Sequence, residues 1–290
     1  MKIVFSYDCE GNWGFVDWAK PPLEGYDPIA LEQVYQTLCK THQEQQIEAC
    51  FAFVGLYTLP QDARHAWVKE HLADLTDTLP NLLAGGGFWE GQKNIECVAQ
   101  AADESPMISI GSHGLTHRPF VGLDPAEQQR EFTNSAEILT QTAGRTPRAF
   151  IYPRNLVSGV QDCLHTYASY RDTETVTLVQ RAVDLNRAVI GVDFPRTPVT
   201  SDFMFWEGGH RRHFNDTGWR RLWRGRMAAA RRGRDRDRII HVWSHPHNFL
   251  TDPDLPARFQ WLMRLLSDNR DVLMFEHLHD VPMGTGRGQL

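Results

Sequence analysis

The sequence predicts an α/β fold in which parallel strands alternate with helices, either as an open sheet or closed into a barrel. Short apolar segments of β-type composition recur along the whole chain, and segments with helical spacing separate them. Of the 290 residues, 41% are apolar, which is enough for a sizeable buried core. We expect one domain over residues 1–290, with a variable arginine-rich segment at about residues 207–238.

The first strand is expected at residues 2–7, where β-branched and aromatic side chains alternate with others. Helical spacing of apolar residues follows over residues 28–46, and residues 49–54 read as a buried strand, so these segments form a β-α-β unit. Asp124 is a helix N-cap with Pro125 at the first helical position, and Gly144 can end that helix. Further strands are expected at residues 107–110, 149–152, 239–243 and 272–275.

Charge and cysteine content exclude several classes of protein. The formal net charge of -6 argues against whole-surface attraction to nucleic acid or anionic membranes. No signal-peptide-like run opens the chain and no segment approaches the ~20 apolar residues of a membrane span, so we expect a cytoplasmic protein. Five cysteines, an odd number in a chain with no export signal, favour reduced thiols over a disulfide framework, and the lack of CxxC spacing argues against a thiolate zinc site.

Two acidic residues stand at the end of the first predicted strand. Asp8 and Glu10 are two positions apart, so both side chains leave a strand on the same face, while Cys9 points to the opposite face and is expected in the core. Like charges held this close shift each other's pKa, which proteins tolerate mainly where a cation or a proton transfer needs them. The alternative is a strand end with two solvated acids.

Polar residues also follow other predicted strands, whose loops converge on one rim of a parallel sheet. His113 and His117 are spaced i and i+4, so both can bind one ion from a helical turn or a tight loop. Two imidazoles with one carboxylate are a common set of ligands for a divalent metal. Together with the acidic pair, the two histidines favour a metal site at this rim.

These residues resemble the motifs of the polysaccharide deacetylase family, also known as the NodB-homology domain or carbohydrate esterase family 4. The matching stretches, in the family's order, are Ser6-Tyr-Asp-Cys-Glu10, Gly111-Ser-His-Gly-Leu-Thr-His117, Phe150-Ile-Tyr-Pro-Arg-Asn155 and His241-Val-Trp-Ser-His-Pro-His247. The resemblance covers roughly residues 1–280 and is to a DxE-type member. It implies a distorted (β/α)7-type barrel and metal-dependent removal of an N-acetyl group from an amino sugar.

The resemblance implies a role for each site residue. Asp8 would be the general base and His245 the general acid, and the backbone N–H of Arg154 would help to hold the oxyanion. The implied metal ligands are Glu10, His113 and His117. Zinc is the expected ion, and Co2+, Ni2+, Mn2+ and Fe2+ fit the same ligands. These parts suffice for amide hydrolysis, which needs an activated water, a base, and an acid for the leaving nitrogen.

The sequence departs from the family pattern in its third motif. Ile151 stands where the family has an arginine that orients the catalytic aspartate. Arg154 or Arg171 is expected to take that role, and we rank Arg154 first. His247 competes with His245 for the role of the acid, and we prefer His245 because it comes first after the strand.

The expected partner is an N-acetylated sugar, free or carried by a nucleotide or lipid, in glycan or natural-product biosynthesis. Trp13 can stack on a sugar ring. The arginines between residues 209 and 238 form either a solvated helix face or a grip for phosphate. Two alternatives stay open: hydrolysis of another C–N bond, as in a deformylase or a cyclic amide or imide hydrolase, and a non-catalytic carbohydrate-binding relative. The residues expected to contact the substrate are Trp13, Tyr152, Pro153, Asn155, Arg171 and His247.

Overall fold

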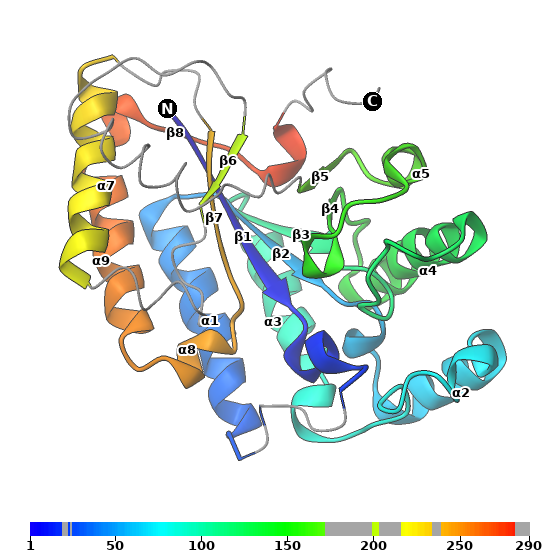
Figure 1. Ribbon diagram of the computed structural model, residues 1–290. Coiled ribbons are helices and arrows are strands. Elements are labelled where there is room, and N and C mark those ends of the chain that lie inside the picture. Colours follow the sequence, from blue (N-terminus) through cyan, green and yellow to red (C-terminus); the bar gives the residue numbers. More distant parts are fainter. Residues whose placement is uncertain (19–22, 24, 172–198, 203–215, 234–238, 282–290) are drawn as a thin grey trace.

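The computed structural model describes residues 1–18, 23, 25–171, 199–202, 216–233 and 239–281. Its centre is a parallel sheet with the strand order β5-β4-β3-β2-β1-β7-β6, and β8 pairs with the first residues of β1 (Figure 1). The sheet curls into a half-barrel, which confirms the predicted distorted barrel. The strands are β1 (Lys2–Cys9), β2 (Ala49–Phe53), β3 (Ile108–Ser112), β4 (Ala149–Ile151), β5 (Ser169–Arg171), β6 (Val199–Asp202), β7 (Ile239–Ser244) and β8 (Met274–Phe275).

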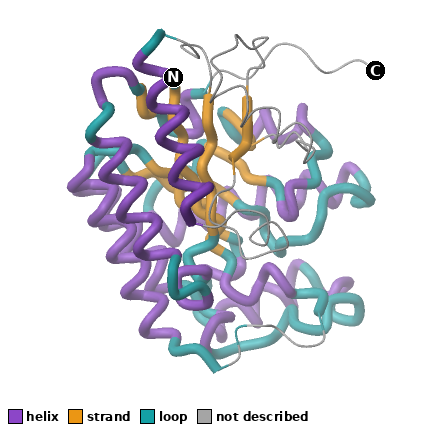
Figure 2. Tube along the Cα trace, turned by 60° about the vertical axis from the view of Figure 1, so that its left-hand side comes forward, coloured by secondary structure: helices purple, strands orange, loops and turns teal. Residues whose placement is uncertain are grey.

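Helices cover the outer face of the sheet, as the turned view in Figure 2 shows. Helix α1 packs against α3 and α9, and α4 packs against α3 and α5. None of the described helices is long and apolar enough to cross a membrane. The α-helices in the described residues are α1 (Pro28–Gln45), α2 (Gln61–His71), α3 (Gln92–Glu104), α4 (Pro125–Ala143), α5 (Val160–Thr166), α7 (Asp216–Arg231), α8 (Asn248–Thr251) and α9 (Leu255–Ser267).

The two faces of β1 have different surroundings, because side chains alternate along a strand. Phe5 and Tyr7 pack into the large core between the sheet and its helices. Val4 lies on the inner face, in a small cluster with Ala52 and Ile151. Cys50 and Ala52 of β2 belong to the same cluster, and a Cβ atom at Gly111 of β3 would lie 2.8 Å from Cys50 Sγ, so the neighbouring strands leave no room for a larger side chain there. Ser6 and Asp8 alternate with the outward-facing residues of β1, so they lie on its inner face together with Val4.

The predicted strands and the two predicted helices are present, with ends that differ by at most two residues. Asp124 caps α4 through a capping box with Glu127, and Gly144 ends that helix in the left-handed conformation at φ 68°. Strands β5 and β6 were not predicted. They have three and four residues, which is too short for an alternation pattern to be recognised.

Candidate active site

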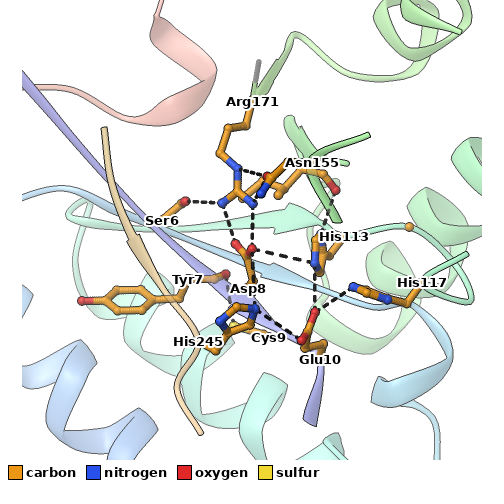
Figure 3. A network of polar contacts seen from close by, with 12 residues as sticks. Ser6, Tyr7, Asp8, Cys9, Glu10, His113, His117, Asn155, Arg171 and His245 are labelled. Atoms are coloured by element: carbon orange, nitrogen blue, oxygen red, sulfur yellow. Dashed lines mark hydrogen bonds and ion pairs between the residues drawn. The ribbon is translucent and has the colours of Figure 1, made fainter. Parts of the chain in front are cut away.

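Acidic and histidine side chains meet at the carboxyl ends of the central strands, as Figure 3 shows. Asp8 and Glu10 come from the end of β1, and His113 follows β3 directly. His117 lies in the loop after β3, and His245 follows β7. The predicted placement of both acids on one face is confirmed, and Cys9 is buried in the core on the opposite face.

Glu10 lies among three imidazole rings. Its Oε2 atom is 3.1 Å from His113 Nε2 and 2.8 Å from His117 Nε2, and its Oε1 atom is 3.3 Å from His245 Nε2. Burial raises the pKa of Glu10, but the charges of His117 and His245 outweigh burial and hold this pKa well below its usual range. Glu10 is therefore a buried carboxylate in its charged form.

Glu10, His113 and His117 fit a divalent metal ion. One donor atom from each lies within 4.8 Å of the others, and all three residues are buried. His113 Nδ1 lies 2.8 Å from the Ile151 carbonyl oxygen and donates to it, so the other ring nitrogen, Nε2, faces Glu10 Oε2 with a lone pair when the ring is neutral and with an N–H when it is charged. Burial lowers the pKa of His113, but Asp8 and Glu10 outweigh burial and raise it. Two lone pairs at that distance repel unless a proton or a cation lies between them. The donor set is one that divalent transition metals prefer.

The His113–His117 spacing is realised by a tight loop and not by a helical turn. His117 adopts a positive φ of 63°, and Gly114 a φ of 83°. The left-handed conformation at His117 turns its ring back toward the ring of His113, and the two ring centroids are 4.8 Å apart.

Arg171 holds Asp8 from the end of β5. Its Nη1 and Nη2 atoms each donate to one carboxylate oxygen of Asp8 at 2.7 Å. Nε and Nη2 donate to Asn155 Oδ1, and Nη1 also donates to Ser6 Oγ. These five hydrogen bonds use the five N–H groups of the guanidinium. Arg171 is 2% exposed, so this buried cation is fixed in one orientation.

A contact between Ser6 and His241 extends the hydrogen-bond network of Arg171 and Asp8. Ser6 Oγ accepts from Arg171, so its own proton is free to be donated to His241 Nε2, 2.9 Å away. Burial lowers the pKa of His241 to about 3, so its ring is a neutral acceptor. Burial raises the pKa of Asp8, but Arg171 and His113 outweigh burial and lower this pKa overall. Asp8 is therefore ionised, and its Oδ2 atom lies 4.0 Å from His245 Nε2.

The ranking of Arg154 above Arg171 as the partner of Asp8 was wrong. The Arg154 guanidinium extends to the rim of the site and pairs with Asp17 Oδ1 at 2.5 Å. Arg171 is the register partner of Ile151 on the neighbouring strand. The two positions therefore lie at the same level along the sheet. For this reason Arg171 on β5 can reach Asp8 as an arginine at residue 151 on β4 would.

Several residues predicted to contact the substrate have other surroundings. Trp13 is 0% exposed and its indole N–H donates to the Trp89 carbonyl, so its ring cannot stack on a sugar. Tyr152 is 0% exposed within an aromatic cluster, and Pro153 is buried as well. Asn155 binds Arg171, which itself is occupied by Asp8. Apolar packing or the Asp8 network already engages these side chains.

The two histidines after β7 differ in position. His245 Nε2 lies within 4.0 Å of both Asp8 and Glu10, and the His245 side chain is 15% exposed. Burial, followed by the charge of His245, lowers the pKa of His247 to about 3. The geometry favours His245 as the residue that can exchange a proton with a bound molecule.

Much of the predicted arginine-rich segment lies outside the described residues. In the described part, α7 packs its arginines against neighbouring side chains. Arg220 pairs with Asp216 and stacks on Trp261, and Arg226 stacks on Trp223. These contacts favour a structural role for the described arginines over a phosphate grip.

Gly14 leaves room for the Glu10 carboxylate. A Cβ atom at this position would lie 2.2 Å from Glu10 Oε1. Because three imidazoles fix that carboxylate, we expect Gly14→Ala to weaken metal binding about 10–100-fold, the effect typical of residues that orient a ligand. Titration of the purified variant with Zn2+ measures this. Gly225→Ala, which adds a Cβ with no atom within 4 Å, is the control. Equal affinities of Gly14→Ala and the control would refute the steric argument.

The chain resembles known proteins in both sequence and structure. Residues 24–162 match the polysaccharide deacetylase family. A Mycobacterium smegmatis protein assigned as a polysaccharide deacetylase has a TM-score of 0.59 at 13% identity, covering 100% of this chain and 94% of that one. A family 4 carbohydrate esterase from Bacillus anthracis has a TM-score of 0.45 at 13% identity, covering 97% and 81%. A family 4 pseudoenzyme from the same organism has a TM-score of 0.42 at 9% identity, covering 89% and 60%. No curated protein matches the chain.

The fold and the rim of polar residues define a (β/α)-barrel protein of the NodB kind. Residues 24–162, the part of the chain that includes His113, His117 and the third motif, are similar in sequence to the polysaccharide deacetylase family.

Proposed function

We propose that the protein is a metal-dependent N-deacetylase that removes the acetyl group from an N-acetylated amino sugar in glycan or natural-product biosynthesis. The observation that carries this proposal is the buried pairing of His113 Nε2 with Glu10 Oε2, 3.1 Å apart, within a group of donor atoms that all lie within 4.8 Å of one another. This arrangement, with His117 beside it, is suited to a divalent cation such as Zn2+, with Co2+, Ni2+, Mn2+ or Fe2+ as alternatives. The sequence match of residues 24–162 to the polysaccharide deacetylase family supports the choice of an N-acetyl group.

A cation bound by Glu10, His113 and His117 would acidify water and polarise the amide carbonyl. Asp8 would take a proton from the attacking water. Its lowered pKa keeps it ionised, and its Oδ2 atom lies 3.9 Å from His113 Nε2, beside the metal ligands. His245 would give a proton to the leaving nitrogen, and the backbone N–H of Arg154 would donate to the developing oxyanion.

Trp18 is a better candidate for sugar stacking than Trp13. Its side chain is 51% exposed, and it follows Asp17, which pairs with Arg154 at the rim of the site. We expect Trp18→Ala to raise KM about 2–10-fold with little change in kcat, because an aromatic contact is worth about 0.5–1.5 kcal/mol. Steady-state kinetics with the best sugar substrate measures this. The control is Met274→Ala, exposed on β8 at the opposite end of the sheet. A fall in kcat alone would argue against a binding role.

The proposal is tested by a product assay on the metal-loaded protein. A panel of N-acetylated sugars, free and nucleotide-linked, is incubated with the protein before and after removal of metal by a chelator. Metal-dependent acetate release supports the N-deacetylase. Formate, or a ring-opened product from a cyclic amide or imide, would assign another C–N bond to the same site. Sugar binding without any turnover in the metal-loaded protein would indicate a carbohydrate-binding relative.

A further inference from the structure

The loop that carries His117 has an unusual set of backbone partners. Its carbonyl oxygens at Gly114 and Leu115 accept from the N–H groups of Gly55 and Leu56, which follow β2. Two of its N–H groups, those of Leu115 and Thr116, both donate to one carboxylate oxygen, at 2.8 and 3.0 Å. Such a pair of adjacent N–H groups around one anion is a nest, the arrangement that proteins use to bind anions.

The anion in this nest is a side chain of the protein, Glu131 on α4. Its Oε2 atom accepts the two loop N–H groups, and its Oε1 atom accepts from Thr116 Oγ1 at 2.5 Å and from Arg118 Nε at 3.4 Å. Glu131 is 0% exposed. Arg118 also pairs with Glu127 at 2.8 Å, so the guanidinium that balances Glu131 is anchored in turn.

We infer that Glu131 is the positioning residue of the metal site. It contacts no metal ligand directly and acts through the backbone between His113 and His117. The loop must hold a left-handed residue at His117, a conformation that is unfavourable for a non-glycine residue and persists only where the surroundings enforce it. Four donors gathered on one buried carboxylate provide that constraint. This inference rests on the proposed metal site.

The test compares Zn2+ affinity, by competition with a chelating indicator, in the full chain and three variants. Glu131→Ala removes the acceptor. Glu131→Asp keeps the negative charge, but its side chain is one methylene shorter, so the carboxylate lies farther from the N–H groups of the loop. Glu137→Gln is the matched control, since Glu137 is an exposed glutamate on the same helix, α4, and is none of the residues that support the loop. The melting temperature of each metal-free variant is measured in parallel, because a residue needed only for folding would lower it without changing the affinity of the folded chain.

We expect Glu131→Ala to bind Zn2+ about 10–100-fold more weakly than the wild type. The affinity of Glu131→Asp should lie between those of Glu131→Ala and the wild type, and that of Glu137→Gln should be unchanged. Wild-type affinity in folded Glu131→Ala would overturn the inference and leave the proposed function intact. If Glu131→Ala does not fold, the same affinity in Glu131→Asp as in the wild type overturns it. A wild-type chain that binds no metal would overturn the proposed function and this inference together.

Discussion

Arg171→Met is expected to lower the free energy of unfolding by about 3–5 kcal/mol, the usual cost of leaving one partner of a buried ion pair alone. With Arg171 gone, burial dominates at Asp8 and its pKa rises, because the cation that outweighed burial is missing. A general base works only when deprotonated, so the acid limb of the pH–rate profile is expected to move to higher pH. Denaturant unfolding and the pH dependence of kcat measure the two effects.

Two further variants test whether Arg171 acts through Asp8. Asp8→Asn combined with Arg171→Met removes both charges, and we expect it to regain stability without activity. Ile151→Arg combined with Arg171→Ile moves the arginine to the register partner on β4, and we expect partial recovery of activity. An Arg171→Met protein with the wild-type pH profile would contradict the assigned role of this arginine.

Asp8→Asn is expected to lower kcat about 10²–10⁴-fold, the usual contribution of a general base, while metal content stays at the wild-type level. An asparagine oxygen can still accept from Arg171, but the amide cannot take a proton from water. The donor group of Glu10, His113 and His117 does not include Asp8, so the metal should remain. Elemental analysis and single-turnover kinetics on the same preparation separate the two effects.

The matched control for Asp8→Asn is Glu10→Gln, two residues along the same face of β1. This variant changes an oxygen that lies 2.8 Å from His117 Nε2, so it is expected to lose metal and activity together. The two acids would then have different roles. Loss of metal from Asp8→Asn, or retention by Glu10→Gln, would require the assignment of base and ligand to be reversed.

Much of the fold could be predicted because its signals are local. The alternation at residues 2–7 and the cap at Asp124 depend on neighbouring residues only, and both elements are present. The order of motifs along the chain likewise placed Asp8, Glu10 and His113 at strand ends. Parallel strands bring their carboxyl ends to one rim, so this juxtaposition follows from the strand positions alone.

The failures concern contacts between distant parts of the chain. Arg171 holds Asp8 across 163 positions of sequence from a strand of three residues, and no periodicity marks such a strand. Trp13 was predicted to stack on a sugar because it closely follows the acidic pair in sequence. Its indole N–H instead donates to the carbonyl oxygen of Trp89, 76 positions later in the chain. Glu131 sits in mid-helix, where a glutamate is ordinarily a solvated residue, and only the tertiary structure shows that it faces a loop.

The central claim is that Glu10, His113 and His117 bind a metal ion on which amide hydrolysis depends. The most direct test is elemental analysis of the purified wild type, Glu10→Ala and His113→Ala after metal reconstitution, with acetate release measured on the same samples. We predict near-stoichiometric metal and acetate release in the wild type and the loss of both in each variant. A wild type without metal after reconstitution, or variants that retain metal and turnover, would contradict the account.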